Sequence, residues 1–280
     1  MRFVIIKVCI TMVLLLLTVH SVQAVSPEVF WLIKGADAIG SGHYESAIIY
    51  YDKALELNPS YTDAWFSKGV TLNSLDRYEE AIECFDKTLE IDPSYTDAWR
   101  GKGIALHSLG RFEEAIECYD KTLKMHLDYS NLWICKGLAH EAIGQYTESV
   151  ECYEKALELD PSEIDAWYYE GNVLYILGQD NSALIFFDKA LELNPNYMAA
   201  WNAKGNILFD LGRYEEAIEC FDKALEIDPS DKDIINMKAS ALEALNSQKA
   251  PLNYICIVLA IPLAGFGYIS TRKKRDNIKN

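Results

Sequence analysis

Tryptophan recurs along this chain at a constant interval. The six tryptophans of the 280-residue sequence follow one another at steps of 34 residues: Trp31, Trp65, Trp99, Trp133, Trp167 and Trp201. A single packed domain scatters its large aromatic residues, whereas a fixed period of about 20–50 residues is typical of one supersecondary unit repeated end to end. The chain is therefore expected to be a repeat array. Such arrays build long surfaces that hold a partner, and they seldom enclose a catalytic pocket.

Other residue types keep the same interval. A glycine follows each tryptophan by four residues, a small residue by sixteen and an aromatic residue by twenty. A proline follows five of the six tryptophans by 28 residues, and Leu127 replaces it after the third. The glycines are Gly35, Gly69, Gly103, Gly137, Gly171 and Gly205; the small residues are Ala47, Ala81, Ala115, Ser149, Ala183 and Ala217; the aromatic residues are Tyr51, Phe85, Tyr119, Tyr153, Phe187 and Phe221; the prolines are Pro59, Pro93, Pro161, Pro195 and Pro229.

This pattern predicts two helices in each repeat. One stripe of residues at helical spacing contains the tryptophan, the glycine and Leu72, and a second contains Ala81, Phe85, Thr88 and Leu89. Between the stripes, a glycine stands where the first helix must end in a left-handed conformation, and the proline ends the second helix. The small residues should let the two helices approach closely, with tryptophan and the other aromatic rings filling the remaining space. The four glycines at the helix end are Gly110, Gly144, Gly178 and Gly212.

These positions resemble the tetratricopeptide repeat. The resemblance implies an all-α fold, a right-handed superhelical solenoid of antiparallel helix pairs, over residues 28–230. Leu127 suggests a looser turn, and Gly40 with Gly42 suggests a less regular first helix end. Residues 232–246 begin a seventh unit without a second helix, which suits a solubilising cap. The six repeats are expected at 28–61, 62–95, 96–129, 130–163, 164–197 and 198–231.

Both ends of the chain are hydrophobic. Arg2 and Lys7 precede an apolar run, and Val22-Gln23-Ala24 suits cleavage, so residues 1–24 are predicted to be a signal peptide; an uncleaved anchor is the alternative. Residues 252–270 lack charge and precede a basic tail at 271–280, which predicts a transmembrane helix. A buried soluble helix and a cleaved sorting signal are the alternatives for this second segment.

The two ends together predict a location. We expect a single-pass protein of the cell membrane with the repeats outside the cytoplasm and the basic tail inside. The sequence has no Asn-x-Ser/Thr glycosylation site, and its repeats carry cysteines that are not paired. Both features favour a prokaryotic source, archaeal or bacterial.

Composition and motifs exclude several kinds of chemistry. The formal net charge of −16 argues against a nucleic-acid partner, whose phosphates would be repelled. Four cysteines share one slot, too far apart for disulfides, and no CxxC pair supports a metal site. They are expected to be buried apolar residues, namely Cys84, Cys118, Cys152 and Cys220. No catalytic constellation is present: His140-Glu141 lacks the second histidine of a zinc protease, and His107 and His140 are expected at the surface or in a groove. The sequence thus predicts no enzyme, metal or cofactor.

The family resemblance implies that the first helices line a concave groove, which would bind a protein or an extended peptide. Among the groove positions only Arg100 is basic, so a chaperone's C-terminal carboxylate is not the expected ligand. Asparagine can bond both polar groups of a peptide backbone, and aromatic rings provide rigid contact area. The candidate groove residues are Phe66, Asn73, Arg100, His107, Asn131, Tyr168, Asn172, Tyr175, Asn202, Asn206 and Phe209.

The function expected from these features is that of a membrane-anchored scaffold for protein or peptide binding. Two alternatives remain open at this point. One is a structural spacer of the cell envelope that assembles with itself. The other is an accessory subunit of a membrane enzyme or secretion complex.

Overall fold

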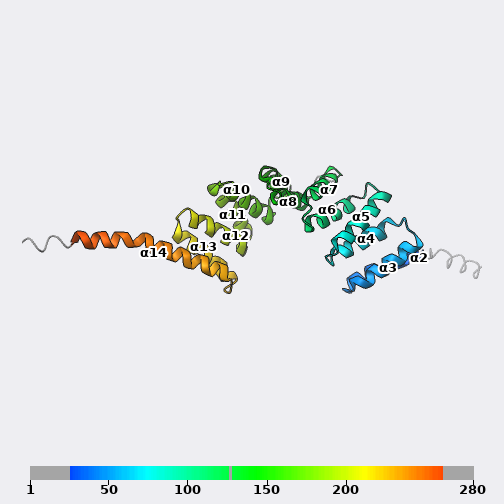
Figure 1. The fold of residues 1–280 in the computed structure, drawn as a ribbon, viewed down its shortest axis with the longest axis horizontal. Helices are drawn as coiled ribbons and strands as arrows, with labels where there is room; N and C mark the ends of the chain where they lie inside the picture. Colours follow the sequence, from blue (N-terminus) through cyan, green and yellow to red (C-terminus); the bar gives the residue numbers. More distant parts are fainter. Residues whose placement is uncertain (1–25, 126–127, 261–280) are drawn as a thin grey trace, which may run out of the picture. The chain divides into compact units, whose positions relative to one another are not determined.

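A computed structural model describes residues 26–125 and 128–260, with side chains to residue 249. The predicted signal peptide (1–24), the basic tail (271–280) and Leu127 lie outside the described residues. Within the described part of the chain every regular element is a helix and no strand occurs. The fold is therefore an all-α solenoid of helix pairs, and Figure 1 shows the helices in chain order.

The chain divides into two compact units between Gly144 and Gln145. The first unit contains α2 (Pro27–Gly40), α3 (Tyr44–Leu57), α4 (Thr62–Asn73), α5 (Tyr78–Ile91), α6 (Thr96–Ser108), α7 (Phe112–Met125) and α8 (Ser130–Ala142). The second contains α9 (Tyr146–Leu159), α10 (Ile164–Ile176), α11 (Asp180–Leu193), α12 (Met198–Asp210), α13 (Tyr214–Ile227) and α14 (Lys232–Ala260). Within each unit a helix packs mainly on its neighbours in sequence.

The second helix of a repeat buries the predicted stripe. On α5, Ala81, Phe85 and Thr88 have no exposed surface and Leu89 is 8% exposed. The recurring glycine makes this packing possible: a Cβ atom at Gly103 would lie 2.5 Å from Cε1 of Tyr119, closer than any real contact. The close approach of the two helices is therefore confirmed. The same arrangement holds at Gly35, Gly69, Gly171 and Gly205.

The first helices end as predicted, in a left-handed residue. Gly110 has φ of 73°, and Gly144, Gly178 and Gly212 have φ of 72–76°. The expectation of an irregular first repeat is wrong, because Gly42 takes the same conformation with φ of 76°. In the second repeat Asp76 occupies this place with φ of 57°, a conformation that aspartate tolerates better than most residues.

The tryptophans pack against the core, as expected, but they are only partly buried there. Trp65 is half-buried, and its indole Nε1–H donates a hydrogen bond of 2.9 Å to the carbonyl oxygen of Pro59. The turn that carries this proline is closed by Asn58, whose Oδ1 accepts from the Ser60 amide at 3.1 Å. The fixed spacing of proline and tryptophan therefore joins one repeat to the next. The same indole bond occurs at Trp99, Trp167 and Trp201.

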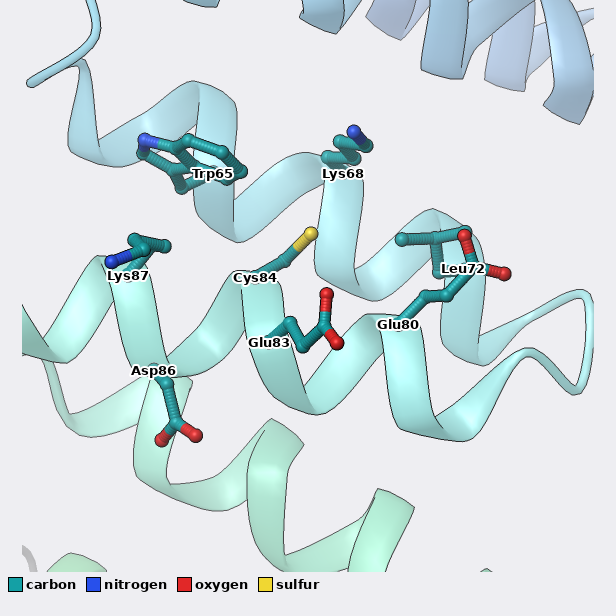
Figure 2. Close-up of a pocket in the computed structure, with 8 residues that line it drawn as sticks. All are labelled: Trp65, Lys68, Leu72, Glu80, Glu83, Cys84, Asp86 and Lys87. Atoms are coloured by element: carbon teal, nitrogen blue, oxygen red, sulfur yellow. The ribbon is translucent and has the colours of Figure 1, made fainter.

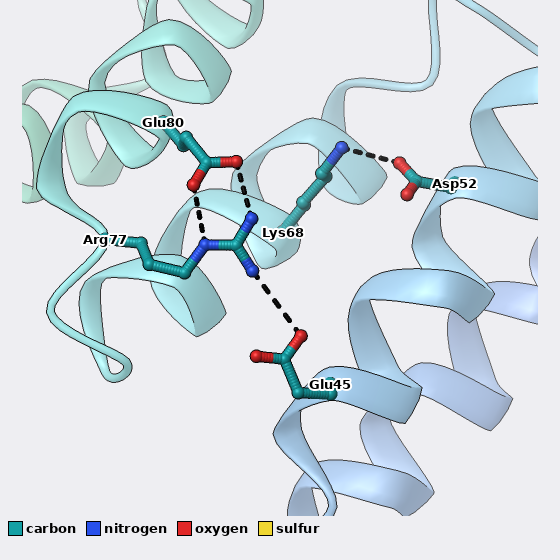
Figure 3. A network of polar contacts seen from close by, with 5 residues as sticks. All are labelled: Glu45, Asp52, Lys68, Arg77 and Glu80. Carbon is teal, nitrogen blue, oxygen red and sulfur yellow. Dashed lines mark hydrogen bonds and ion pairs between the residues drawn. The ribbon is translucent and has the colours of Figure 1, made fainter.

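Ion pairs also join successive repeats. A lysine three residues after the tryptophan pairs with an aspartate on the preceding second helix, as Lys68 does with Asp52 at 2.6 Å (Figure 3). Beside this pair, Arg77 contacts Glu80 and reaches Glu45 of α3 at 3.4 Å. The other pairs of this kind are Lys102–Asp86, Lys136–Asp120 and Lys204–Asp188, and Lys238–Asp222 repeats the pattern with Ile235 in the tryptophan position.

The last described helix is longer than expected. A cap was predicted to end at residue 246, but α14 continues from Lys232 to Ala260. Asp231 caps its N-terminus by accepting from the amides of Asp233 and Ile234, each at 3.0 Å. The predicted membrane segment begins inside this helix, and its part beyond residue 260 lies outside the described residues. None of the described helices is both long and apolar enough to cross a bilayer.

Candidate functional site

In the first unit, the predicted groove positions of α4 and α6 line a pocket of about 300 Å³. Its apolar wall consists of Phe66, Val70 and Ile104 together with the ring of Phe85. Val70 is 43% exposed and Ile104 37% exposed, so the pocket offers apolar surface to a partner. The structure therefore brings together three of the predicted site residues, Phe66, Asn73 and Arg100.

The polar groups of this pocket stand at its edge. Arg100 is exposed and donates to Asp97 on its own helix at 2.9 Å. Asn73 Nδ2 donates to the carbonyl oxygen of Gly101 at a long 3.5 Å. The Oδ1 atom of Asn73 is buried and accepts no hydrogen bond from the described residues. A buried amide oxygen without a donor is costly.

In the second unit, the predicted groove residues of α10 and α12 form an aromatic surface. The Tyr168 ring meets Tyr197 edge-on at 5.1 Å and also lies 5.9 Å from Phe187. Tyr197 donates its hydroxyl to Asp165 at 2.8 Å. Burial, reinforced by this hydrogen bond, raises the pKa of the Tyr197 phenol. Tyr197 therefore stays neutral at physiological pH and packs against Tyr168.

Two asparagines on α12 present unsatisfied oxygens. The Oδ1 atoms of Asn202 and Asn206 are buried and accept no hydrogen bond from any described residue. The two residues are one helical turn apart, so they lie on one face of α12. Few buried polar atoms in folded proteins lack a partner. The pair therefore marks a place on α12 where the described residues leave two buried acceptors without a donor.

The far end of this surface is held by a second tyrosine. Tyr175 donates its hydroxyl to Asp210, a short contact between the ends of α10 and α12. That hydrogen bond raises the pKa of Tyr175 to about 12. The Phe209 ring lies 5.4 Å from Tyr214, and Asn172 is half-buried on α10. Six predicted residues thus belong to two neighbouring first helices of the second unit.

The remaining predicted residues lie apart from these two surfaces. Asn131 is exposed on α8. His107 is half-buried on α6 against Phe112, and burial lowers its pKa. The placement of His140 at the surface or in a groove is wrong, because it is only 9% exposed. The two-residue pattern His140-Glu141 does not indicate which face of α8 is buried, so the sequence did not predict that the imidazole is buried.

The cysteines behave as apolar residues. Cys84, Cys118, Cys152 and Cys220 are 3–4% exposed and form no disulfide within the described residues. Burial raises the pKa of the Cys84 thiol to about 11, which keeps it protonated. Across the described residues, no three histidine, cysteine, aspartate or glutamate side chains are grouped to hold a metal.

Sequence reasoning missed the tyrosines that support the groove. Tyr95 donates to Asp63 at 3.2 Å and packs on Phe66, as Tyr197 does with Asp165 and Tyr168 in the second unit. A signal existed, because tyrosine stands four residues before four of the tryptophans. Also missed was a second kind of pocket, between the two helices of one repeat, which Figure 2 shows at Trp65.

Family comparisons agree with the repeat pattern. Models described as the tetratricopeptide repeat match residues 38–61, 62–95, 96–129, 137–175, 164–197 and 199–231. A stretch of 37 residues is 46% identical to the uncharacterized protein MJ0572 of Methanocaldococcus jannaschii. That stretch is 13% of this chain and spans 43% of the relative's length.

Solved structures share the fold. YrrB, described as a tetratricopeptide-repeat protein with an unusual peptide-binding site, is 25% identical with a TM-score of 0.56, covering 71% of this chain and 97% of YrrB. MamA residues 41 to the end, from Desulfovibrio magneticus, is 22% identical with a TM-score of 0.60, covering 62% and 99%. Pseudomonas aeruginosa pilF is 18% identical with a TM-score of 0.63, covering 76% and 97%. The last two likenesses concern the fold alone.

Proposed function

Because this chain belongs to the tetratricopeptide-repeat family, whose fold suits protein–protein interaction, we propose that it is a scaffold that binds an extended segment of a partner protein along its first helices. The observation that carries the proposal is the pair of buried, unsatisfied oxygens of Asn202 and Asn206 beside the Tyr168 cluster. The likeness to YrrB, which has a peptide-binding site, supports the same reading.

The chemistry of binding follows from these groups. Each asparagine oxygen accepts a backbone N–H of the ligand, and the matching amide nitrogen donates to a ligand carbonyl. Tyr168 and Phe209 pack against ligand side chains with little loss of rotamer freedom. In the first unit, the pocket at Phe66 and Ile104 takes an apolar side chain. The scaffold performs no catalysis in this proposal.

Photo-crosslinking tests the proposal in the native cell. A photoreactive residue at Phe209 should give a discrete adduct with a protein partner, identified by mass spectrometry. The same residue at Glu151, an exposed position of α9 in the same unit, is the matched control. Equal adducts from both positions, or none from Phe209, would contradict binding on this surface.

The asparagines supply a sharper test. Replacing Asn202 and Asn206 by alanine removes acceptors that have no donor in the free protein, so stability should stay the same or rise slightly. Adduct formation from Phe209 should fall about tenfold or more, because the ligand loses two hydrogen bonds. A variant that loses stability and keeps the adduct would show that these side chains serve the fold and not the ligand.

The proposal includes attachment to a membrane. Residues 252–270 form the anchor, the repeats face outward and the basic tail at 271–280 stays inside, in a prokaryotic cell. The support is the uncharged run followed by Arg272-Lys273-Lys274-Arg275. Protease added to intact cells should digest the repeats. Repeats that survive while an external control protein is digested would overturn this orientation.

Two alternatives keep their own tests. Concentration-dependent oligomers of the purified chain, with no other partner, would favour a spacer that assembles with itself. Copurification with a polytopic protein that depends on residues 252–270 would favour an accessory subunit of a membrane complex.

A further inference from the structure

Among the described residues, the second and the sixth repeat each carry an open pocket between their own two helices. The pocket at Trp65 has a volume of about 400 Å³ and the pocket at Trp201 about 430 Å³. Figure 2 shows the first, with Trp65, Lys68 and Leu72 on α4 and the remaining lining residues on α5. Each pocket has the indole, a leucine and a buried cysteine as its apolar wall, and glutamates at its rim.

In two other repeats the chain places its own lysine over the same indole. The lysine is always 22 residues after the tryptophan. The Nζ atom of Lys121 lies 4.8 Å from the centre of the Trp99 ring, and that of Lys53 lies 4.3 Å from the Trp31 ring. A cation within about 6 Å of an indole centre is attracted by the ring face. The fold therefore already contains the complex of this indole with an alkylammonium group.

Neighbouring residues explain why the equivalent lysines do not cover Trp65 and Trp201. Lys87 and Lys223 hold the equivalent positions, but each pairs with a glutamate three residues later, Glu90 at 2.7 Å and Glu226 at 2.8 Å. Lys121 has Lys124 in that place, so it turns to the ring instead.

The first repeat also has a glutamate in that place, Glu56, yet its lysine covers the indole. There Tyr50 replaces the cysteine and stacks on Trp31 at 5.6 Å. Lys53 thereby gains a second ring, with its Nζ atom 5.6 Å from the Tyr50 centre. In the fifth repeat Phe186 replaces the cysteine and packs on Trp167 at 5.2 Å. In the first and fifth repeats an aromatic ring therefore stands where Cys84 and Cys220 line the pockets of the second and sixth repeats.

The charges in each pocket favour a cationic guest. Around Trp65, Lys68 is held by Asp52, Asp86 by Lys102 and Glu80 by Arg77. Glu83 lines the same pocket and forms no ion pair with residues 26–125 or 128–249. Glu219 likewise lines the pocket at Trp201 and forms no ion pair with these described residues. The nearest cation to each indole is a lysine held by an aspartate, Lys68 at 5.8 Å from Trp65 and Lys204 at 5.7 Å from Trp201. In both pockets the lysine of the second helix therefore leaves the indole, and one uncommitted carboxylate lies beside it.

We propose that the pockets at Trp65 and Trp201 each bind the side-chain cation of a lysine or arginine from a protein partner. The alkyl stem packs on the indole and the cysteine, and the charged group lies between the ring face and Glu83 or Glu219. These pockets lie between the two helices of one repeat and do not share their indoles with the first-helix groove. They add a second, charge-selective surface to the scaffold. Binding in these pockets does not depend on binding in the first-helix groove, so each can be tested without the other.

Nuclear magnetic resonance of the indole N–H groups tests this in the full-length chain. The probe is Nα-acetyl-lysine methylamide, and the control is the uncharged Nα-acetyl-norleucine methylamide of similar length. Tryptophan-to-phenylalanine variants assign the signals. The Trp65 and Trp201 signals should shift saturably with the lysine probe, about two- to fivefold more strongly than with norleucine. Trp99 and Trp167, covered by Lys121 and Phe186, should respond least.

Exchanging one residue between repeats makes matched variants. Glu90→Lys gives Lys87 the neighbour that Lys121 has, so Lys87 should cover Trp65 and reduce its response several-fold, while Trp201 stays responsive. Lys124→Glu should draw Lys121 away and make Trp99 responsive. The proposal is overturned if norleucine shifts the signals as much as lysine does, or if Trp99 responds as strongly as Trp65 in the unmodified chain.

Discussion

Two helix junctions, α5–α6 and α9–α10, share one backbone arrangement but differ in charge. The first joins a lysine to an aspartate, and the second brings two glutamates together. At the first, Lys102 Nζ lies 2.5 Å from Asp86 Oδ1, an ion pair that recurs wherever this lysine occurs from the second repeat onward. At the second, the same two register positions hold Glu170 and Glu154. One pair of positions is therefore attractive in most of the repeats and repulsive in the fifth.

The surroundings of Glu170 increase the contrast. The lysines of the regular pairs keep 16–32% of their side-chain surface exposed, but Glu170 is only 3% exposed. Its Oε2 atom accepts no hydrogen bond within the described chain. Burial first, and the charge of Glu154 second, raise the pKa of Glu170 to about 8. At neutral pH this carboxyl group is therefore mostly protonated.

The difference teaches that repeats alike in backbone need not be alike in stability. In a solenoid, stability is close to a sum of local terms from repeats and their neighbours. A junction with a buried carboxyl group is thus a place where the second unit opens more easily than its sequence pattern suggests. Four predictions test the comparison, all read by hydrogen exchange of the backbone amides, which reports local opening.

The largest effect should be a pH dependence confined to α9 and α10. The folded pKa of Glu170 lies above the value of 4.5 expected for the unfolded chain, so the folded state binds the extra proton. Stability should therefore be full below about pH 4.5 and fall as the pH rises to about 8, by about 4–5 kcal/mol. Glu170→Gln cannot ionise and should remove this fall, measured as the difference in exchange between the two proteins. Equal pH dependence in both would refute the assignment to Glu170.

A smaller loss is expected when the regular junction is given the fifth repeat's chemistry. Lys102→Glu removes the ion pair and places a second carboxylate beside Asp86. Because these side chains are partly exposed, solvent screens the repulsion, and α5 and α6 should lose about 1–2 kcal/mol. Lys102→Gln is the control and should lose less, since it adds no like charge. Similar losses in both variants would show that repulsion plays no part.

The reverse exchange should stabilise the second unit. Glu170→Lys places a cation opposite Glu154, and at about pH 8 it should slow exchange in α9 and α10 by about 1 kcal/mol. Phe186 occupies space that the cysteine leaves free in other repeats, which limits the gain. Adding Phe186→Cys should enlarge it. Faster exchange in the double variant than in the natural chain would mean that packing, and not charge, decides this junction.

The smallest effect should come from salt. About 1 M sodium chloride shortens the screening length to about 3 Å and weakens exposed ion pairs. The α5–α6 junction should lose about 0.5 kcal/mol or less, whereas the α9–α10 junction should stay unchanged or become slightly more stable. Salt that destabilises both junctions equally would indicate a general effect on the fold.

Much of the architecture could be predicted because it depends on contacts near in sequence. Gly103 faces Tyr119 across one turn, and Gly110 reverses the chain directly after its helix, so a fixed spacing is enough to reveal both. The candidate groove positions follow from the same register once the family is recognised. The half-buried state of the tryptophans was less predictable from the sequence. An indole has a large apolar ring and a polar N–H group, so it can lie in the core or at its edge.

The sequence by itself determined the repeat, its two helices, the left-handed turns and the identity of the residues at each register position. Only the tertiary structure decided which polar atoms are left without partners. Three examples are the hydrogen bonding of Asn206, the choice of Lys87 between Trp65 and Glu90, and the exposure of Glu170 to solvent. Each depends on how the surrounding side chains pack in the folded chain. Periodicity reports the contacts that every repeat shares. The binding surfaces and the buried carboxyl group arise where one repeat departs from the others, and the cost of each departure depends on burial that exists only in the folded chain.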